Sequence, residues 1–215
     1  MAAEEERPGA GAWVPERPTP ARLQEAVQAC RGCELYRDAT QGVMGTGNRD
    51  APVVLLGEQP GDQEDRRGEP FVGPAGKVLD RALADAGIDP GDVWTTNVVK
   101  HFRWSGTRGK QRIHKSPARY HVEACSPWLR AELEMVRPAG VVLLGGTAGK
   151  ALYGSSFRVG ESRGRLLDWP ETLPLDAPPE WVLPTTHPSA VLRTEGRDEA
   201  YAALVADFMV AAGKL

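Results

Sequence analysis

A stretch of the chain without any carboxylate, residues 93–122, combines positive charge with a nucleophilic side chain. The whole chain is mildly acidic, with 29 Asp and Glu against 26 Lys and Arg, so random mixing would place several acids there. A surface without negative charge is typical of proteins that meet phosphate groups. The segment Gly109-Lys-Gln-Arg-Ile-His114 looks like a loop and ends in an imidazole, so we expect binding and chemistry to coincide. The cationic side chains of the stretch are Lys100, Arg103, Arg108, Lys110, Arg112, Lys115 and Arg119.

Other side chains capable of acid, base or hydrogen-bond chemistry stand at or just after the ends of short apolar segments. Glu58, Asn97 and His187 are in such places. A carboxylate directly after a buried segment is expensive unless it faces a cleft or a partner. Each residue alone has an ordinary alternative: Glu58 could cap a loop or a helix, and His187 could be a hydrogen-bonded histidine. Phe71 could equally be core, and His114 could be one more phosphate contact.

The chain has three cysteines, two of which form the pair Cys30-Arg-Gly-Cys33. This pair follows a predicted helix, whereas a thioredoxin-type redox pair lies between a strand and a helix. Ligation of a metal or cluster is the better interpretation, and unpaired structural cysteines are the alternative. Cys125 is the remaining thiol, so a site with four ligands needs an imidazole, and His101 and His121 are the nearest candidates.

The segment Gly145-Gly-Thr-Ala-Gly-Lys150 is similar to a phosphate-binding loop but lacks its requirements. Only three residues separate Gly145 from Gly149, and Ala151 stands where a Ser or Thr would hold magnesium. We interpret it as a tight turn between a strand and a helix.

Strand and helix patterns alternate along the chain, which predicts an α/β/α sandwich of three layers with a central four-stranded parallel sheet. In such folds reactive residues gather at the carboxyl ends of the strands, where Glu58, Asn97, Gly145 and His187 stand. The predicted strands are residues 53–56, 93–96, 141–144 and 181–183. The predicted helices are residues 20–29, 77–86, 116–136 with a possible break at Pro127, 147–152 and 197–212.

Length and composition are those of one globular domain, which we place at residues 19–215. Residues 1–18 are rich in Pro, Gly and Glu and are predicted to be a disordered tail. No apolar run approaches the length that spans a membrane, and the acidic start lacks the pattern of a signal peptide. We therefore expect a cytoplasmic protein with reduced thiols, monomeric by default and without an evident protein partner.

Taken together, these segments closely resemble the iron–sulfur branch of the uracil-DNA glycosylase superfamily. Two features are similar to its X-type subclass, which cross-links to DNA: His101 stands where the branch has a cysteine, and the chain contains the Lys-Gln-Arg-Ile-His114 insertion. The resemblance runs from about Cys30 to the last helix. It is carried by Cys30-Arg-Gly-Cys33, Gly57-Glu-Gln-Pro-Gly-Asp-Gln-Glu-Asp65, Gly68-Glu-Pro-Phe-Val-Gly-Pro-Ala-Gly76, Thr96-Asn-Val-Val-Lys100, Ala124-Cys-Ser-Pro-Trp-Leu129 and His187-Pro-Ser189.

The resemblance implies an enzyme that excises uracil from DNA, preferably single-stranded, with a [4Fe–4S] cluster on Cys30, Cys33, His101 and Cys125. It further implies that His114, instead of water, captures deoxyribose C1′. The catalytic residues are then Glu58, His114 and His187. Phe71 stacks on the base, Asn97 reads its edge, and the loop of Gln59, Gly61 and Asp62 offers backbone amides. Contacts with DNA come from Lys110, Arg112, Lys115 and Ser189.

A neutral His114 is needed for this attack, and we expect the cations Lys110, Arg112 and Lys115 to disfavour its protonation. Two alternatives remain open: a conventional hydrolytic glycosylase with many turnovers, and a binding module for uracil-containing DNA without catalysis.

Overall fold

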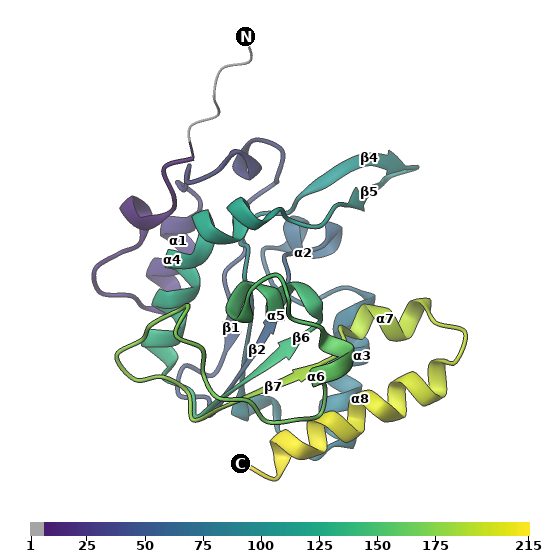
Figure 1. Cartoon of the computed structure of the whole chain (residues 1–215). Helices are drawn as coiled ribbons and strands as arrows, with labels where there is room; N and C mark the ends of the chain where they lie inside the picture. The colour runs from purple at the N-terminus through teal and green to yellow at the C-terminus, as the bar shows by residue number, and fades with distance from the viewer. Residues whose placement is uncertain (1–6) are drawn as a thin grey trace.

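The computed structural model describes residues 7–215, at whose centre lies a five-stranded sheet (Figure 1). Its strand order is β1-β3-β2-β6-β7, and all neighbours are parallel except β1, which is antiparallel to β3. The predicted α/β/α sandwich is confirmed. The prediction of four parallel strands is wrong by one strand, because β1 has two residues and is too short to show a periodic pattern. The strands are β1 (Thr46–Gly47), β2 (Val53–Gly57), β3 (Val93–Asn97), β6 (Gly140–Leu144) and β7 (Trp181–Thr185).

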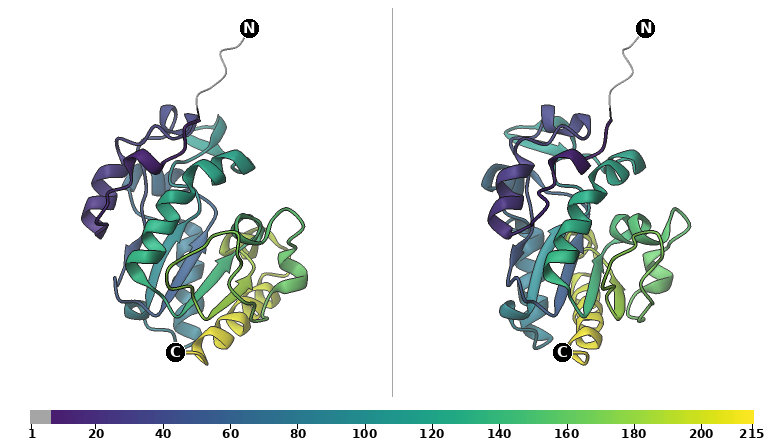
Figure 2. Two further views of the ribbon diagram at one scale, coloured as in Figure 1. Left: turned by 60° about the vertical axis from the view of Figure 1, so that its left-hand side comes forward. Right: turned by 90° about the vertical axis from the view of Figure 1, so that its left-hand side faces the viewer.

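Helices cover both faces of the sheet, and α4 and α8 lie on opposite sides of it (Figure 1 and Figure 2). Within β2, Val54 and Leu56 join the cluster of α1, α4 and α5, whereas Val53 and Leu55 join that of α3, α7 and α8. Burial on both faces explains why the strands read as continuous apolar runs. The helices are α1 (Pro20–Val27), α2 (Asp62–Arg67), α3 (Pro74–Asp85), α4 (Arg119–Val136), α5 (Gly146–Tyr153), α6 (Val159–Ser162), α7 (Pro188–Arg193) and α8 (Arg197–Ala212), with short 3-10 turns η1 (Gly11–Trp13), η2 (Glu34–Arg37) and η3 (Pro90–Asp92).

Helix α4 continues through Pro127, so the possible break there does not occur. Proline has no N–H for the carbonyl of residue i−4, which here is Glu123. The hydroxyl of Ser126 donates to that carbonyl at 2.9 Å instead. This substitute bond keeps one helix between the thiol of Cys125 and the end of α4.

The start of the described chain differs from the predicted disordered tail. Residues 7–18 contain the turn η1, and Ala10 is buried. The N–H of Gly9 donates to Gly32 O at 3.1 Å, and the N–H of Ala10 donates to Ala124 O at 2.7 Å. These bonds fix the segment against the cysteine-bearing region, a tertiary effect that composition does not reveal; residues 1–6 lie outside the described part.

The segment predicted as a loop before His114 is a two-stranded hairpin, β4 (Trp104–Arg108) and β5 (Gln111–His114), turning at Gly109. It projects from the body of the molecule (Figure 1). Its side chains are mostly exposed, so its strands lack the apolar alternation that would have predicted them. Among residues 7–215, no helix is long and apolar enough to cross a membrane.

Candidate active site

A cavity of about 500 Å³ opens where the parallel strands end. Pairing brings Gly57 of β2 opposite Asn97 of β3 and Leu144 of β6 opposite Thr185 of β7, so the residues after each strand meet at one edge. Asp62, Lys110, Arg112 and Lys115 lie outside the lining. The predicted residues that line the cavity are Glu58, Gln59, Gly61, Phe71, Asn97, His114, His187 and Ser189.

Glu58 follows β2, and its carboxylate has two unlike oxygens. Its backbone carbonyl accepts from the N–H of Val99 at 3.1 Å. Side-chain Oε2 accepts from the hydroxyl of Thr147 at 2.5 Å. Oε1 is buried and accepts no hydrogen bond from the described residues, but His114 Nε2 lies 3.4 Å from it. This oxygen is therefore placed to attract a cation or take a proton.

His114 ends β5 and brings its imidazole to the cavity beside Glu58. Its side chain is 46% exposed, so a ligand can reach the ring. Burial lowers its pKa, Glu58 raises it and Arg193 lowers it again, with a net result below the ordinary value. The cation that disfavours protonation is thus Arg193 of α7, and the expectation that Lys110, Arg112 and Lys115 have this effect is wrong.

His187 caps the N-terminus of α7 through its own ring nitrogen. Nδ1 accepts from the N–H of Ser189 at 3.1 Å and lies 2.8 Å from the Ser189 hydroxyl. Arg193 in turn donates to that hydroxyl at 3.1 Å. Burial, with Arg193 and His114, lowers the pKa of His187 to about 4. A neutral ring with Nδ1 as acceptor carries its proton on Nε2, which makes His187 a hydrogen-bond donor.

Phe71 and Asn97 lie against the end of β2, and the packing leaves no room for a side chain at Gly57. A Cβ there would stand 2.4 Å from Asn97 Oδ1 and 2.7 Å from Phe71 Cζ. Phe71 has a left-handed backbone, with φ of 55°, and its ring stacks near His187 with centroids 5.9 Å apart. Left-handed non-glycine residues are uncommon, and here the conformation turns the ring toward the cavity.

Gln59 lines the cavity, but its side-chain amide is bound to the hairpin and is not free for a ligand. Its Nε2 donates to Arg103 O at 3.0 Å and to Lys115 O at 3.2 Å. Its Oε1 accepts from the N–H of Arg103 at 3.1 Å. Because these residues flank the hairpin, one side chain next to Glu58 holds both of its arms.

Arg112, predicted to contact DNA, is instead held by carboxylates of the protein. Its guanidinium lies 2.5 Å from Asp62 and 2.8 Å from Asp65 and is mostly buried, with Phe102 and Trp104 beside it. These pairs join β5 to α2. Asp62, predicted to bind substrate, shares this structural role, and its side chain also pairs with Arg66 at 3.3 Å.

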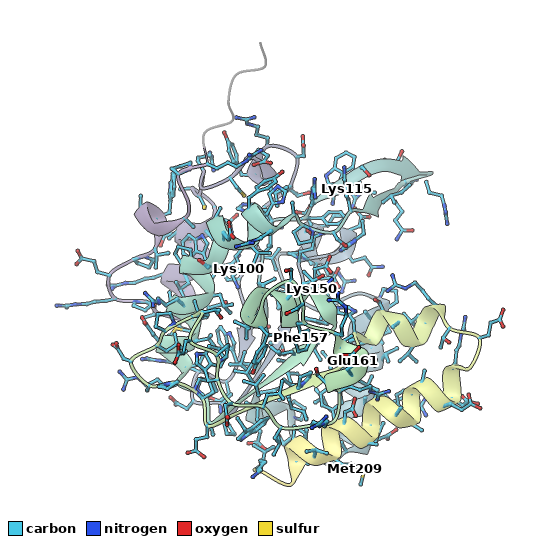
Figure 3. The ribbon with its side chains drawn as sticks, in the orientation of Figure 1. Lys100, Lys115, Lys150, Phe157, Glu161 and Met209 are labelled. Atoms are coloured by element: carbon cyan, nitrogen blue, oxygen red, sulfur yellow. The ribbon has the colours of Figure 1, made fainter. Side chains whose placement is uncertain are left out.

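The remaining cations of residues 93–122 also differ in placement. Lys100 is fully buried, with its Nζ 2.5 Å from Glu132 Oε2 and 2.6 Å from Asn97 O. Lys110 and Lys115 are exposed, and Figure 3 shows Lys115 at the hairpin and Lys100 within the body. Net charge along the sequence therefore overstates the phosphate-binding surface, because part of it stabilises the fold.

The three cysteines are buried, unpaired thiols in one core cluster. Burial raises the pKa of Cys33 to about 11 and that of Cys125 to about 12. The N–H of Lys100 donates to Cys125 Sγ at 3.3 Å, and the indole N–H of Trp128 donates to Cys30 Sγ at 3.4 Å. Donors aimed at sulfur are a feature of iron–sulfur sites.

His101 is buried, and its pKa falls to about 4 mainly through burial, so its ring is neutral as a ligand must be. Among residues 7–215, no three His, Cys, Asp or Glu side chains are close enough to hold a single metal ion. Three thiols that share one core cluster, together with a neutral imidazole, are the kind of donors that would hold an iron–sulfur cluster. His121, the other candidate imidazole, instead bonds Glu34 at 3.0 Å and the N–H of Ala118 at 2.8 Å.

Several lining residues were not found from the sequence: Glu64, Ser116, Thr147, Thr186 and Arg193. Thr147 was within reach, because it follows a strand end in the segment that we interpreted only as a turn. Arg193 could also have been found: a helix that begins at Pro188 places residue 193 one turn after Ser189, on the same face. Glu64, whose carboxylate accepts from the N–H of Gly73 at 2.8 Å, gave no signal of its own.

The cavity thus gathers one aromatic ring, one carboxylate and two imidazoles where the parallel strands end. The family model described as the uracil-DNA glycosylase superfamily matches residues 44–209, and the chain belongs to this family. A type-4 uracil-DNA glycosylase of Thermotoga maritima is 34% identical over 177 residues, covering 82% of this chain and 84% of that protein. One of Pyrobaculum aerophilum is 34% identical over 172 residues, covering 80% and 84%. One of Archaeoglobus fulgidus is 39% identical over 127 residues, covering 59% and 60%.

Proposed function

We propose that this chain excises uracil from DNA and that His114 then bonds to deoxyribose C1′, leaving a stable protein–DNA adduct. Family membership and the type-4 relatives support the excision. One observation supports the covalent step: inside the cavity, His114 Nε2 lies 3.4 Å from Glu58 Oε1, a buried oxygen that accepts no hydrogen bond from residues 7–215. A nucleophile beside a proton acceptor is the arrangement that covalent catalysis needs.

Recognition of the base falls to Phe71 and Asn97. The uracil must leave the helix stack or come from a single strand, and flipping costs a few kcal/mol. Stacking on Phe71 offsets part of this cost, and the Asn97 amide hydrogen-bonds the uracil edge. Because single strands avoid the cost of unpairing, we propose that they are the preferred substrate. Equal rates on single-stranded and duplex oligonucleotides would contradict that preference.

Cleavage of the glycosidic bond leaves negative charge on uracil and positive charge on the sugar. The Nε2–H of neutral His187 donates to the departing pyrimidine oxygen, and backbone amides of Gln59 and Gly61 add donors. The Glu58 carboxylate stabilises the sugar cation. The electron pair of the bond between N1 and C1′ thus leaves with uracil.

Capture by His114 follows at the same carbon. The proton on His114 Nε2 passes to Glu58 Oε1, the freed lone pair forms the bond to C1′, and a neutral alkylated imidazole results. A neutral alkylated imidazole would have to leave as an imidazolate anion, which is a poor leaving group, so each molecule reacts once. Nδ1 of His187 accepts from the N–H of Ser189, and we assign this ring to the uracil rather than to C1′.

For the cofactor, we propose that Cys30, Cys33, His101 and Cys125 hold a [4Fe–4S] cluster. One imidazole among three thiolates makes such a site less anionic and tends to raise its reduction potential. Cys30 and Cys33 pack in the same core cluster as Cys125 of α4, and the Trp128 indole of α4 donates to Cys30 Sγ, so we assign the cluster a structural role.

Denaturing gel electrophoresis after incubation with a single-stranded uracil oligonucleotide separates the candidate functions. The proposal predicts free uracil in a stoichiometric amount and a band that migrates as protein plus DNA. Free uracil over many turnovers without that band would show a hydrolytic glycosylase instead. A salt-sensitive shift in a native gel without uracil release would show a binding module.

Two alanine variants test whether His114 is the nucleophile. His114→Ala should abolish the adduct while uracil release continues, because the groups that recognise and release the base remain. Ile113→Ala, at the exposed neighbour of His114 on β5, is the control and should cross-link like the parent. Undiminished cross-linking by His114→Ala would refute the assignment of the nucleophile.

A further inference from the structure

Helix α5 begins directly after β6, and its first turn places a threonine beside Glu58. The turn requires glycine: Gly145 has φ of 93°, and a Cβ on it would lie 2.9 Å from that of His187. This tight turn between β6 and α5 brings Thr147 to the cavity lining, where its hydroxyl donates to Glu58 Oε2 at 2.5 Å. The segment that is similar to a phosphate-binding loop therefore points a hydroxyl at a carboxylate, not at a phosphate.

We propose that Thr147 is a positioning residue that fixes the Glu58 carboxylate so that only Oε1 faces His114 and the sugar. The inference rests on the proposed function, because it gives Glu58 Oε1 the proton-accepting step. The carboxylate would otherwise rotate about its last side-chain bond and exchange its two oxygens. When Thr147 holds Oε2, the position of Oε1 is fixed as well. Oε1 then points toward His114 Nε2, which lies 3.4 Å away.

Two independent anchors thus set the distance between nucleophile and carboxylate. Gln59 binds both arms of the hairpin and so fixes the position of His114, the nucleophile. Thr147 fixes the carboxylate of Glu58, and the bond from Val99 N–H to Glu58 O fixes the backbone of that residue. Thr147 also stands at the N-terminus of α5, where the helix dipole favours an anion. The hydroxyl therefore acts through Glu58 and does not touch the reacting atoms.

The test is single-turnover kinetics of adduct formation with a uracil oligonucleotide, comparing Thr147→Val, Thr147→Ser and the parent. Valine keeps the shape but not the donor, so the rate constant at saturation should fall about 10- to 100-fold, the range for a hydrogen bond to a charged group. The half-saturating oligonucleotide concentration should change less than about twofold, because base and phosphate contacts remain. Serine restores the donor and should bring the rate within about threefold of the parent.

A double-mutant cycle with Glu58→Gln separates positioning from a general effect on the fold. If Thr147 acts through the carboxylate, Thr147→Val should cost little in the Glu58→Gln background. An equal loss in both backgrounds, or equally slow Val and Ser variants, would overturn the inference. Thr46→Val, the same change at an exposed position of the edge strand β1, should leave the rate unchanged.

Failure of the inference and failure of the proposed function give different results. An adduct in the parent with an unchanged rate in Thr147→Val sinks the inference alone. Uracil release without an adduct in the parent sinks the covalent step, and the same variants then test Thr147 through the rate of uracil release, because Glu58 also stabilises the sugar cation. A parent that neither releases uracil nor cross-links refutes both.

Discussion

The cavity receives its functional groups from two regions of different construction, the ends of the parallel strands and the hairpin β4–β5. Glu58, Asn97 and His187 stand at the ends of β2, β3 and β7, whose residues are buried except for the half-buried Thr95. His114 stands on an exposed hairpin that is held by Gln59 and by the ion pairs of Arg112. Under the proposed function, base release therefore depends on the rigid core, whereas the covalent step depends on an appended element.

The largest effect is expected from the strand-end region. His187→Ala removes the donor to the departing pyrimidine oxygen, so uracil release should slow about 10²- to 10³-fold. Affinity for the oligonucleotide should stay within a few-fold. Release assayed by chromatography of free base checks this, and a variant that cross-links at the parent rate would contradict the division between the regions.

A smaller and more selective effect is expected when the hairpin loses an anchor. Gln59→Ala leaves the Arg103 N–H and the Lys115 carbonyl without this partner, which costs about 1–3 kcal/mol and loosens the hairpin. Adduct formation should slow about tenfold or more while uracil release is largely kept. Gln63→Ala, an exposed glutamine of α2, is the control. Equal losses in release and cross-linking would show that the two regions are not separable.

The pH dependence of cross-linking reports on the protonation of His114, which lies where the hairpin meets the strand ends. Burial and Arg193 hold the pKa of His114 below the ordinary value of about 6.5, despite Glu58. Because the neutral ring attacks, the rate should be constant at neutral pH and fall only below pH 6.5. Arg193→Gln removes a cation that lowers this pKa, so its acid limb should move to higher pH. Single-turnover rates, scaled to each plateau, measure the shift, and a limb that does not move would contradict the assignment to Arg193.

The smallest effect concerns the exposed cations of the hairpin. Lys110→Ala should weaken binding a few-fold and reduce the salt slope of log affinity by about one, as expected for one lost phosphate contact. Arg112→Ala should instead lower the melting temperature, because it breaks buried pairs with Asp62 and Asp65. Binding titrations at several salt concentrations and thermal melts distinguish the two, and identical behaviour would refute the separate roles.

The sequence predicted the strand-end region well because buried strands leave continuous apolar runs, and the residue after each run must lie at one edge of the sheet. Glu58, Asn97 and His187 were found in this way and line one cavity. Roles of individual cations could not be predicted, because Lys100 and Arg112 meet partners far along the chain, Glu132, Asp62 and Asp65. The hairpin was missed because an exposed ribbon has no hydrophobic period.

The most direct test of the covalent step is peptide mapping by mass spectrometry after reaction with a short uracil oligonucleotide. We expect one modified peptide that contains His114, with the deoxyribose-phosphate mass on a ring nitrogen. A modification at any other residue, or complete base loss with only unmodified protein recovered, would contradict it.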